Sequence, residues 1–102
     1  MYDQLVFSGH AITRMAQRHL STGEIEYVIR NGRRYRSAGV IHCFLGRRDI
    51  PRSDRRNGQL SRLEGTTVLL DSMQAETVIT VYRNRSAPKK IGRKAKYNRK
   101  LF

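Results

Sequence analysis

The sequence is poor in the residues that build disulfides, metal centres and membrane spans. It has one cysteine, Cys43, so neither an internal disulfide nor a zinc site built on cysteine pairs is possible. The longest strongly apolar run, at residues 68–70, is far shorter than the roughly 20 residues of a membrane-spanning helix. The first residues lack the basic-then-apolar pattern of a secretory signal. We therefore expect a cytoplasmic protein that does not enter a membrane.

Acidic residues are also scarce, with eight Asp and Glu against 21 Lys and Arg, which gives a net charge of +13. The eight acids are scattered and form no paired carboxylates, and the three histidines at 10, 19 and 42 have no recognised zinc spacing. We therefore expect neither a metal ion nor another cofactor. An excess of positive charge on this scale indicates a polyanionic partner, and we expect RNA.

The positive charge is concentrated in two segments of the 102-residue chain. Residues 84–102 carry eight basic residues and no acid, while the Gly- and Arg-rich loop at 46–58 carries five arginines. We therefore expect one α+β domain at residues 1–83 and a basic C-terminal tail at residues 84–102. The predicted RNA-binding residues are Arg47, Arg48, Arg52, Arg55 and Arg56 in the loop, Arg83 at the end of the domain, and Arg85, Lys89, Lys90, Arg93, Lys94, Lys96, Arg99 and Lys100 in the tail.

The tail has too few apolar residues to fold alone, so we expect it to be disordered when free. An arm of this kind lies along phosphates, and each neutralised phosphate releases counterions. Deleting residues 84–102 should therefore flatten the salt dependence of RNA affinity. The alternative is a solubilising tail without a binding role.

Local signals predict a first helix from a Ser8 N-cap to about His19. Its expected apolar face contains Ala11, Ile12, Met15, Ala16 and His19. On this face His19 is expected to pack or to cap the helix end.

A second helix is predicted from a capping box formed by Ser21 and Glu24. Gly32 is expected to end this helix in the left-handed conformation. The residues expected on its buried side are Ile25, Val28 and Ile29.

Strands are predicted at residues 33–37, 40–45, 66–71 and 76–83, with a short first strand at 4–7 and a turn at 38–39. In the last strand Ile79 and Val81 are expected to face the helices, with Thr80 and Tyr82 on the opposite, partly open face. His42 and Cys43 should point to opposite faces, which excludes a catalytic dyad. The predicted fold is α+β, with two N-terminal helices packed on a small antiparallel sheet of about four strands and a basic C-terminal extension.

The stretch HAITRMAQRHLSTGEIEYVIRNG, which begins at His10, and the strand TVITVYR at 77–83 resemble a bacterial family of domains of unknown function. That family is similar to the RelE and ParE toxins, within a wider group of small barnase-like, colicin-like and RelE-like ribonuclease folds. The resemblance covers about residues 8–83. It implies a compact α+β fold, action on the ribosome or, for ParE relatives, on gyrase, and neutralisation by an antitoxin protein.

Metal-independent RNA cleavage needs a proton carrier and cations around the phosphate. His10 can carry a proton near neutral pH, and Arg14 and Arg18 follow it on one flank of the first helix as phosphate clamps. Thr80 and Tyr82 would orient a sugar or stack a base. These five residues are the candidate catalytic set, although the sequence offers no second acid or base. The alternative is that Arg14 and Arg18 are ordinary solvent-exposed residues and that His10 forms only local hydrogen bonds near the helix start.

Three functions remain open at this point. The first is a metal-independent, toxin-type endoribonuclease acting on mRNA at or near the ribosome. The second is a non-catalytic RNA-binding or ribosome-associated protein that uses the loop and the tail. The third, which is less favoured, is an inhibitor of a protein target. A DNA-binding helix-turn-helix at 8–31 is disfavoured, because Glu24 and Glu26 lie on the second helix.

Overall fold

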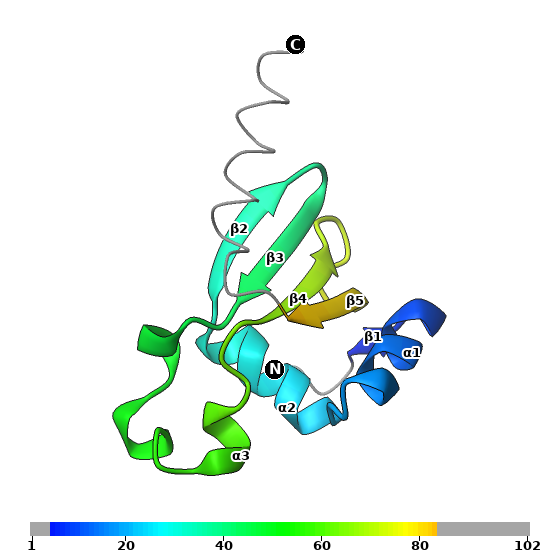
Figure 1. Cartoon of the computed structure of the whole chain (residues 1–102). Coiled ribbons are helices and arrows are strands. Elements are labelled where there is room, and N and C mark those ends of the chain that lie inside the picture. The colour runs from blue at the N-terminus through cyan, green and yellow to red at the C-terminus, as the bar shows by residue number, and fades with distance from the viewer. Residues whose placement is uncertain (1–4, 84–102) are drawn as a thin grey trace.

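A computed structural model describes residues 5–83 of the chain, while residues 1–4 and 84–102, which include the predicted basic tail, lie outside the described part. Helices and strands occur together, which confirms the α+β class (Figure 1). Within the described residues, no helix has the length and apolar character to cross a membrane. The elements in chain order are β1 (Val6–Phe7), α1 (Gly9–Gln17), α2 (Thr22–Asn31), β2 (Arg33–Ser37), β3 (Val40–Phe44), the 3-10 turns η1 (Arg47–Asp49) and η2 (Arg52–Asp54), α3 (Gly58–Ser61), β4 (Thr66–Asp71) and β5 (Thr77–Arg83).

The strands form one sheet in the order β1-β5-β4-β3-β2. Strands β2 to β5 pair antiparallel, as predicted, but β1 adds a fifth strand that runs parallel to β5. The N–H groups of Val6 and Ser8 donate to the carbonyls of Glu76 and Val78 and hold this edge in place. The prediction of about four antiparallel strands is therefore incomplete, because a two-residue strand is too short to show its pairing in the sequence.

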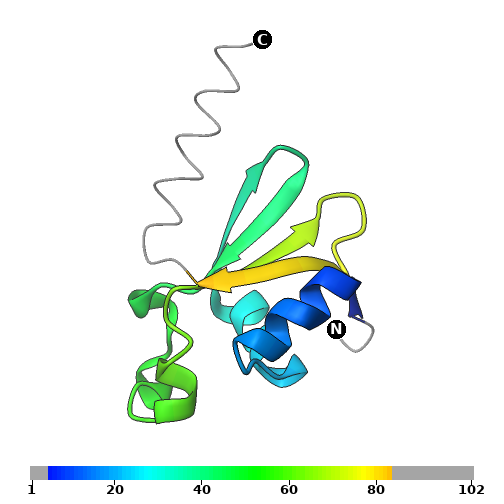
Figure 2. The ribbon, with the colours of Figure 1, turned by 45° about the vertical axis from the view of Figure 1, so that its right-hand side comes forward.

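Helix α1 begins where it was predicted, since the Ser8 hydroxyl accepts from the Ala11 N–H. Only Ala11 and Met15 are buried on it, however, while Ile12 is 58% exposed. The predicted apolar face is too wide because α1 packs mainly on β5, near one side of the sheet (Figure 2). His19 is exposed directly after the C-cap Arg18 with a φ of 54°, so the expectation that it packs is wrong, whereas its left-handed backbone is typical of a residue at a helix end.

Helix α2 has the predicted capping box and buries Ile25, Val28 and Ile29. Gly32 ends it differently from the prediction, with an extended φ of −74° and ψ of 163°. Glycine is needed there for space: an added Cβ would lie 2.6 Å from the Val28 carbonyl oxygen and 2.8 Å from the Phe44 carbonyl oxygen. The end of α2 thus approaches the end of β3 backbone to backbone.

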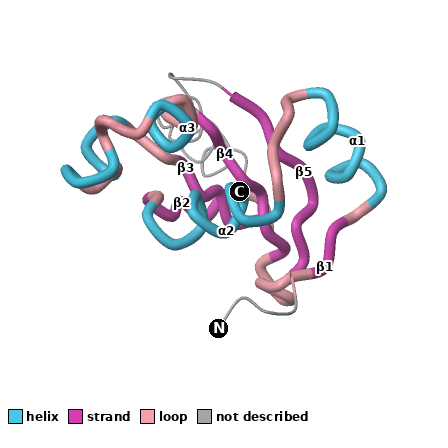
Figure 3. The backbone as a smooth tube through the Cα atoms, turned by 90° about the horizontal axis from the view of Figure 1, so that it is seen from below, coloured by secondary structure: helices cyan, strands magenta, loops and turns pink. Residues whose placement is uncertain are grey.

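Helices α1 and α2 cover one face of the sheet and share its core, as the view from below shows (Figure 3). A register shift places Leu69 opposite Thr80 but Leu70 opposite Val78, so Ile79 is an extra residue on β5. Both Val78 and Val81 are consequently fully buried in the core. The prediction of Ile79 and Val81 as the buried pair is wrong for Ile79, because the bulge breaks the strict alternation of the strand.

Strands β2 and β3 form the predicted hairpin, with Ala38 and Gly39 at φ angles of 54° and 78°. Positive φ at both turn residues matches the right-handed twist of the strands. Cys43 of β3 is fully buried, as predicted, and burial raises the pKa of its thiol.

Candidate functional site

The five predicted catalytic side chains lie in different parts of the molecule. His10 is exposed in the first turn of α1, and Arg18 caps the other end, about 12 Å further along the helix axis. Between them, Arg14 donates to the Gln17 side chain at 3.4 Å. Thr80 and Tyr82 belong to β5 and point to the sheet face that α1 does not cover. In this arrangement the five side chains do not converge on a single phosphate.

The second face of the sheet, which we call the open face, carries Tyr82 in an aromatic cluster. Helices α1 and α2 pack on the other face, although His42 and Thr67 on this face are also buried. Phe44 is the buried centre of the cluster, and the half-buried rings of Tyr35 and Tyr82 pack against it. Burial raises the pKa of the Tyr82 hydroxyl. Two cross-strand rows make up the centre of the open face: Arg33, Phe44, Thr67 and Tyr82, then Tyr35, His42, Leu69 and Thr80.

A pocket of about 250 Å³ opens beside the cluster at one end of the sheet. We call it the aromatic–arginine pocket, since it is lined by Arg33, Tyr35, Phe44, Gly46, Arg47, Arg48 and Asp49.

The only carboxylate among these lining residues is already engaged. Asp49 accepts from Arg33 Nε at 3.1 Å and from the Gly46 N–H at 2.8 Å. The hydrogen bond to Asp49 raises the pKa of Arg33 further above its usual value. Arg47 and Arg48 are exposed and have no carboxylate partner in the described part of the chain. The pocket therefore combines aromatic rings with an excess of guanidinium charge.

The predicted Arg-rich loop at 46–58 has regular local structure instead of being a simple loop. It contains η1 and η2, and the side chain of Ile50 between them is only 2% exposed. The Tyr27 hydroxyl of α2 donates to Asp54 at 2.8 Å, and Arg55 Nε donates to the Ile50 carbonyl at 3.2 Å. The first contact holds the loop against α2 and the second lies within the loop, while all five arginines stay exposed.

Replacing Tyr27 with Phe should lower the free energy of unfolding by about 1 kcal/mol, because it removes a hydrogen bond to a carboxylate in a partly exposed site. Burial and then the Asp54 hydrogen bond raise the pKa of Tyr27 from 10.0 to about 12. The raised pKa means that this stabilisation is complete below pH 10 and is lost as the pH rises towards 12. Urea unfolding of both proteins across this range measures the difference, and an equal alkaline loss in Tyr27→Phe would contradict the assignment.

The sequence missed three members of the open face, Arg33, Tyr35 and Phe44. An available signal was the alternation of residues 33 and 35 on β2 and of 42 and 44 on β3, which places each pair on one face once the hairpin register is known. His42 and Cys43 do face opposite sides, as predicted. Among residues 5–83, no group of three or more His, Cys, Asp or Glu side chains is arranged to hold a metal ion.

Comparison with known protein families matches residues 7–83 to a domain of unknown function (DUF4258). Comparisons with curated proteins and with solved structures gave no significant match. The matched segment runs from β1 to the last residue of β5 and so includes both long helices, the Arg-rich loop and most of the described sheet. The chain therefore belongs to the DUF4258 family.

Proposed function

We propose that this protein binds single-stranded RNA on the open face of its sheet. The aromatic–arginine pocket carries this proposal, since it sets the rings of Tyr35 and Phe44 beside Arg33, Arg47 and Arg48. Single-stranded RNA exposes its bases, which proteins recognise by stacking them on aromatic rings while basic groups follow the phosphates. The pocket supplies both kinds of contact within one small volume.

The type of basic residue supports the same function. All 13 basic residues of the segment 1–83 are arginines, and every lysine of the chain lies in the tail. A guanidinium is planar, so it binds phosphate through two parallel hydrogen bonds and also stacks on bases, which a lysine ammonium does not do. Arginines beside aromatic rings can therefore contact both the phosphates and the bases of a single strand, whereas lysines would supply only electrostatic attraction to phosphates.

The geometry favours RNA binding without RNA cleavage. A RelE-like endoribonuclease would need its proton carrier near the bound phosphate, whereas His10 lies on α1, on the other side of the sheet from Tyr82. A second form of the proposal is a toxin related to RelE and ParE. Such a toxin would act at or near the ribosome and would be neutralised by an antitoxin protein. Incubation with ribosomes and mRNA tests this second form: cleavage that is lost in a His10→Ala, Arg14→Ala protein would support it.

Fluorescence anisotropy with a labelled single-stranded oligoribonucleotide tests the binding proposal. Replacing Tyr35 with Leu should weaken binding about tenfold, because stacking contributes roughly 1–3 kcal/mol per base. Replacing Arg47 and Arg48 with Gln should reduce the slope of log affinity against log salt by about 1.4, since each phosphate that an arginine neutralises adds about 0.7 to it. Thermal unfolding of each variant separates a folding defect from a binding defect.

A matched control for the double variant is Arg30→Gln with Arg36→Gln, which removes the same charge from two exposed positions outside the pocket. We expect its salt slope and affinity to stay close to those of the original protein. Equal losses in the two double variants would show that net charge alone attracts the RNA, and this result would overturn the open face as the binding site.

A further inference from the structure

A second pocket, of about 210 Å³, lies on the helix side of the sheet where α1 ends. Arg18, Arg62 and Arg83 line it together with the polar side chains of Gln17 and Thr66, and we call it the three-arginine pocket. Its volume is below the roughly 300 Å³ that is typical of sites for drug-sized ligands. The pocket is therefore suited to a compact anionic group.

Three separate parts of the chain bring the arginines together. Arg18 is the C-cap of α1, and Arg62 is the C-cap of α3. Arg83 ends β5 opposite Thr66, two residues after the buried Val81, so it shares the helix side of the sheet with Val81. Residues from distant points in the sequence thus converge on one small volume.

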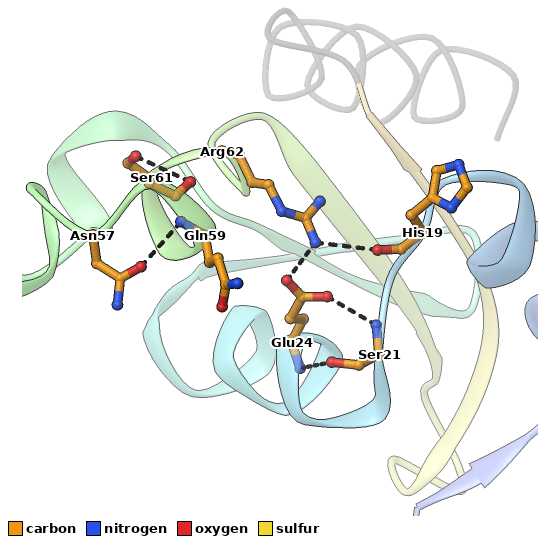
Figure 4. A network of polar contacts seen from close by, with 8 residues as sticks. His19, Ser21, Glu24, Asn57, Gln59, Ser61 and Arg62 are labelled. Carbon is orange, nitrogen blue, oxygen red and sulfur yellow. Dashed lines mark hydrogen bonds and ion pairs between the residues drawn. The ribbon is translucent and has the colours of Figure 1, made fainter.

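Hydrogen bonds to neighbouring groups hold two of the guanidinium groups in place. Arg62 Nη2 donates to the His19 carbonyl at 3.1 Å and also pairs with the Glu24 carboxylate (Figure 4). Glu24 is itself held, because its other oxygen accepts from the Ser21 N–H at 2.9 Å. Arg83 Nε donates to the Glu64 carbonyl at 3.1 Å. Both side chains are therefore oriented before any ligand arrives.

The pocket keeps an excess of positive charge after these contacts are counted. Arg62 has Glu24 as its carboxylate partner, whereas Arg83 donates to a backbone carbonyl, which carries no net charge. The Arg18 side chain makes no hydrogen bond or ion pair within residues 5–83. Two guanidinium groups thus have donors available to a ligand, which matches an anion that carries up to two negative charges and several acceptor oxygens.

We propose that the three-arginine pocket binds a phosphate ester. The phosphate can belong to a free nucleotide or to the backbone of a nucleic acid, since both present the same oxygens to the guanidinium groups. This site lies on the helix side of the sheet, away from the aromatic–arginine pocket. It therefore does not depend on RNA binding by the open face.

Isothermal titration of the full-length protein tests the proposal with three probes: orthophosphate, adenosine 5′-monophosphate and a short oligoribonucleotide with a 5′-hydroxyl. The variants Arg18→Gln and Arg83→Gln should each weaken binding of the accepted probe about tenfold, since each removes a hydrogen bond between two charged groups. Arg18→Gln is the more direct variant, because this side chain makes no polar contact with the rest of the described fold. Arg30→Gln is the control with the same loss of charge.

The choice of probe identifies the source of the phosphate. Arginine-dependent binding of orthophosphate or the mononucleotide indicates a free or terminal phosphate, whereas such binding of the oligoribonucleotide alone indicates a backbone phosphate. Either outcome supports the pocket. Absence of binding by all three probes, or equal weakening in Arg18→Gln, Arg83→Gln and Arg30→Gln, would overturn it. An open-face variant such as Tyr35→Leu should leave orthophosphate binding unchanged, so the two proposed sites can fail separately.

Discussion

Replacing Gly32 with Ala is expected to destabilise the protein by about 3 kcal/mol, at the upper end of the range for overpacking a tight site. The new methyl group would lie 2.6 Å from the Val28 carbonyl oxygen and 2.8 Å from the Phe44 carbonyl oxygen. Both neighbours are backbone atoms, so no change of side-chain rotamer can relieve the contact. The end of α2 would have to move away from β3, and packing of the core around Val28 and Ile29 would suffer with it.

Equilibrium unfolding in urea measures this change, and Gly9→Ala is its control. Gly9 is the first residue of α1, and a Cβ added there meets nothing within 4 Å. We expect the control to change stability by no more than about 0.5 kcal/mol, as is usual for an unconstrained surface position. A small and equal effect of both substitutions would show that the contact between α2 and β3 is looser than described.

A second large effect is expected from replacing the five loop arginines, Arg47, Arg48, Arg52, Arg55 and Arg56, with glutamine. If each contacts one phosphate of single-stranded RNA, the slope of log affinity against log salt falls by up to about 3.5. The fold should survive, because the variant loses only the hydrogen bond from Arg55 to Ile50 within the loop, while the burial of Ile50 and the hydrogen bond between Tyr27 and Asp54 remain. Anisotropy titrations at several salt concentrations give the slope directly.

The comparison for this variant removes five charges from the tail, at Lys89, Lys90, Arg93, Lys94 and Lys96. We expect the tail variant to reduce the slope of log affinity against log salt by a similar amount. Its RNA affinity at high salt should stay that of the original protein. The loop variant should lose part of that affinity as well, because Arg47 and Arg48 also line the aromatic–arginine pocket. Indistinguishable behaviour of the two variants at high salt would argue against the pocket.

The features that the sequence predicted correctly are set by residues that are close together in the sequence. Both N-caps, the buried side of α2 and the turn at 38–39 follow from short motifs whose geometry is largely set within a few residues. The role of Gly32 could not be predicted in the same way, since the atoms that demand a glycine there include the carbonyl of Phe44, on a different element. Likewise, the bulge at Ile79 depends on the pairing of β5 with β4.

The candidate sites likewise depend on contacts between distant parts of the sequence, which the sequence alone does not show. Arg18 and Tyr82 were singled out from their own helix and strand, yet the structure places them on opposite sides of the sheet and gives each a different set of partners. Tyr35 was missed because the segment Arg33–Ser37 contains three arginines and looks like an exposed strand. Its ring contributes to a site only through Phe44, on the neighbouring strand. The alternation of residues along a strand predicts which face of the sheet a side chain lies on, whereas the pairing of strands determines which side chains it contacts there.

Strand β2 forms one outer edge of the described sheet, and arginines occupy three of its five positions. The backbone N–H and C=O groups along such an edge offer a template on which another sheet can extend. Like charges on the β2 edges of two copies repel each other, although Asp49 offsets the charge of Arg33. A polyanion that neutralises them would remove that barrier. The solubility of the protein, and its tendency to self-associate, should therefore change when a polyanion is added.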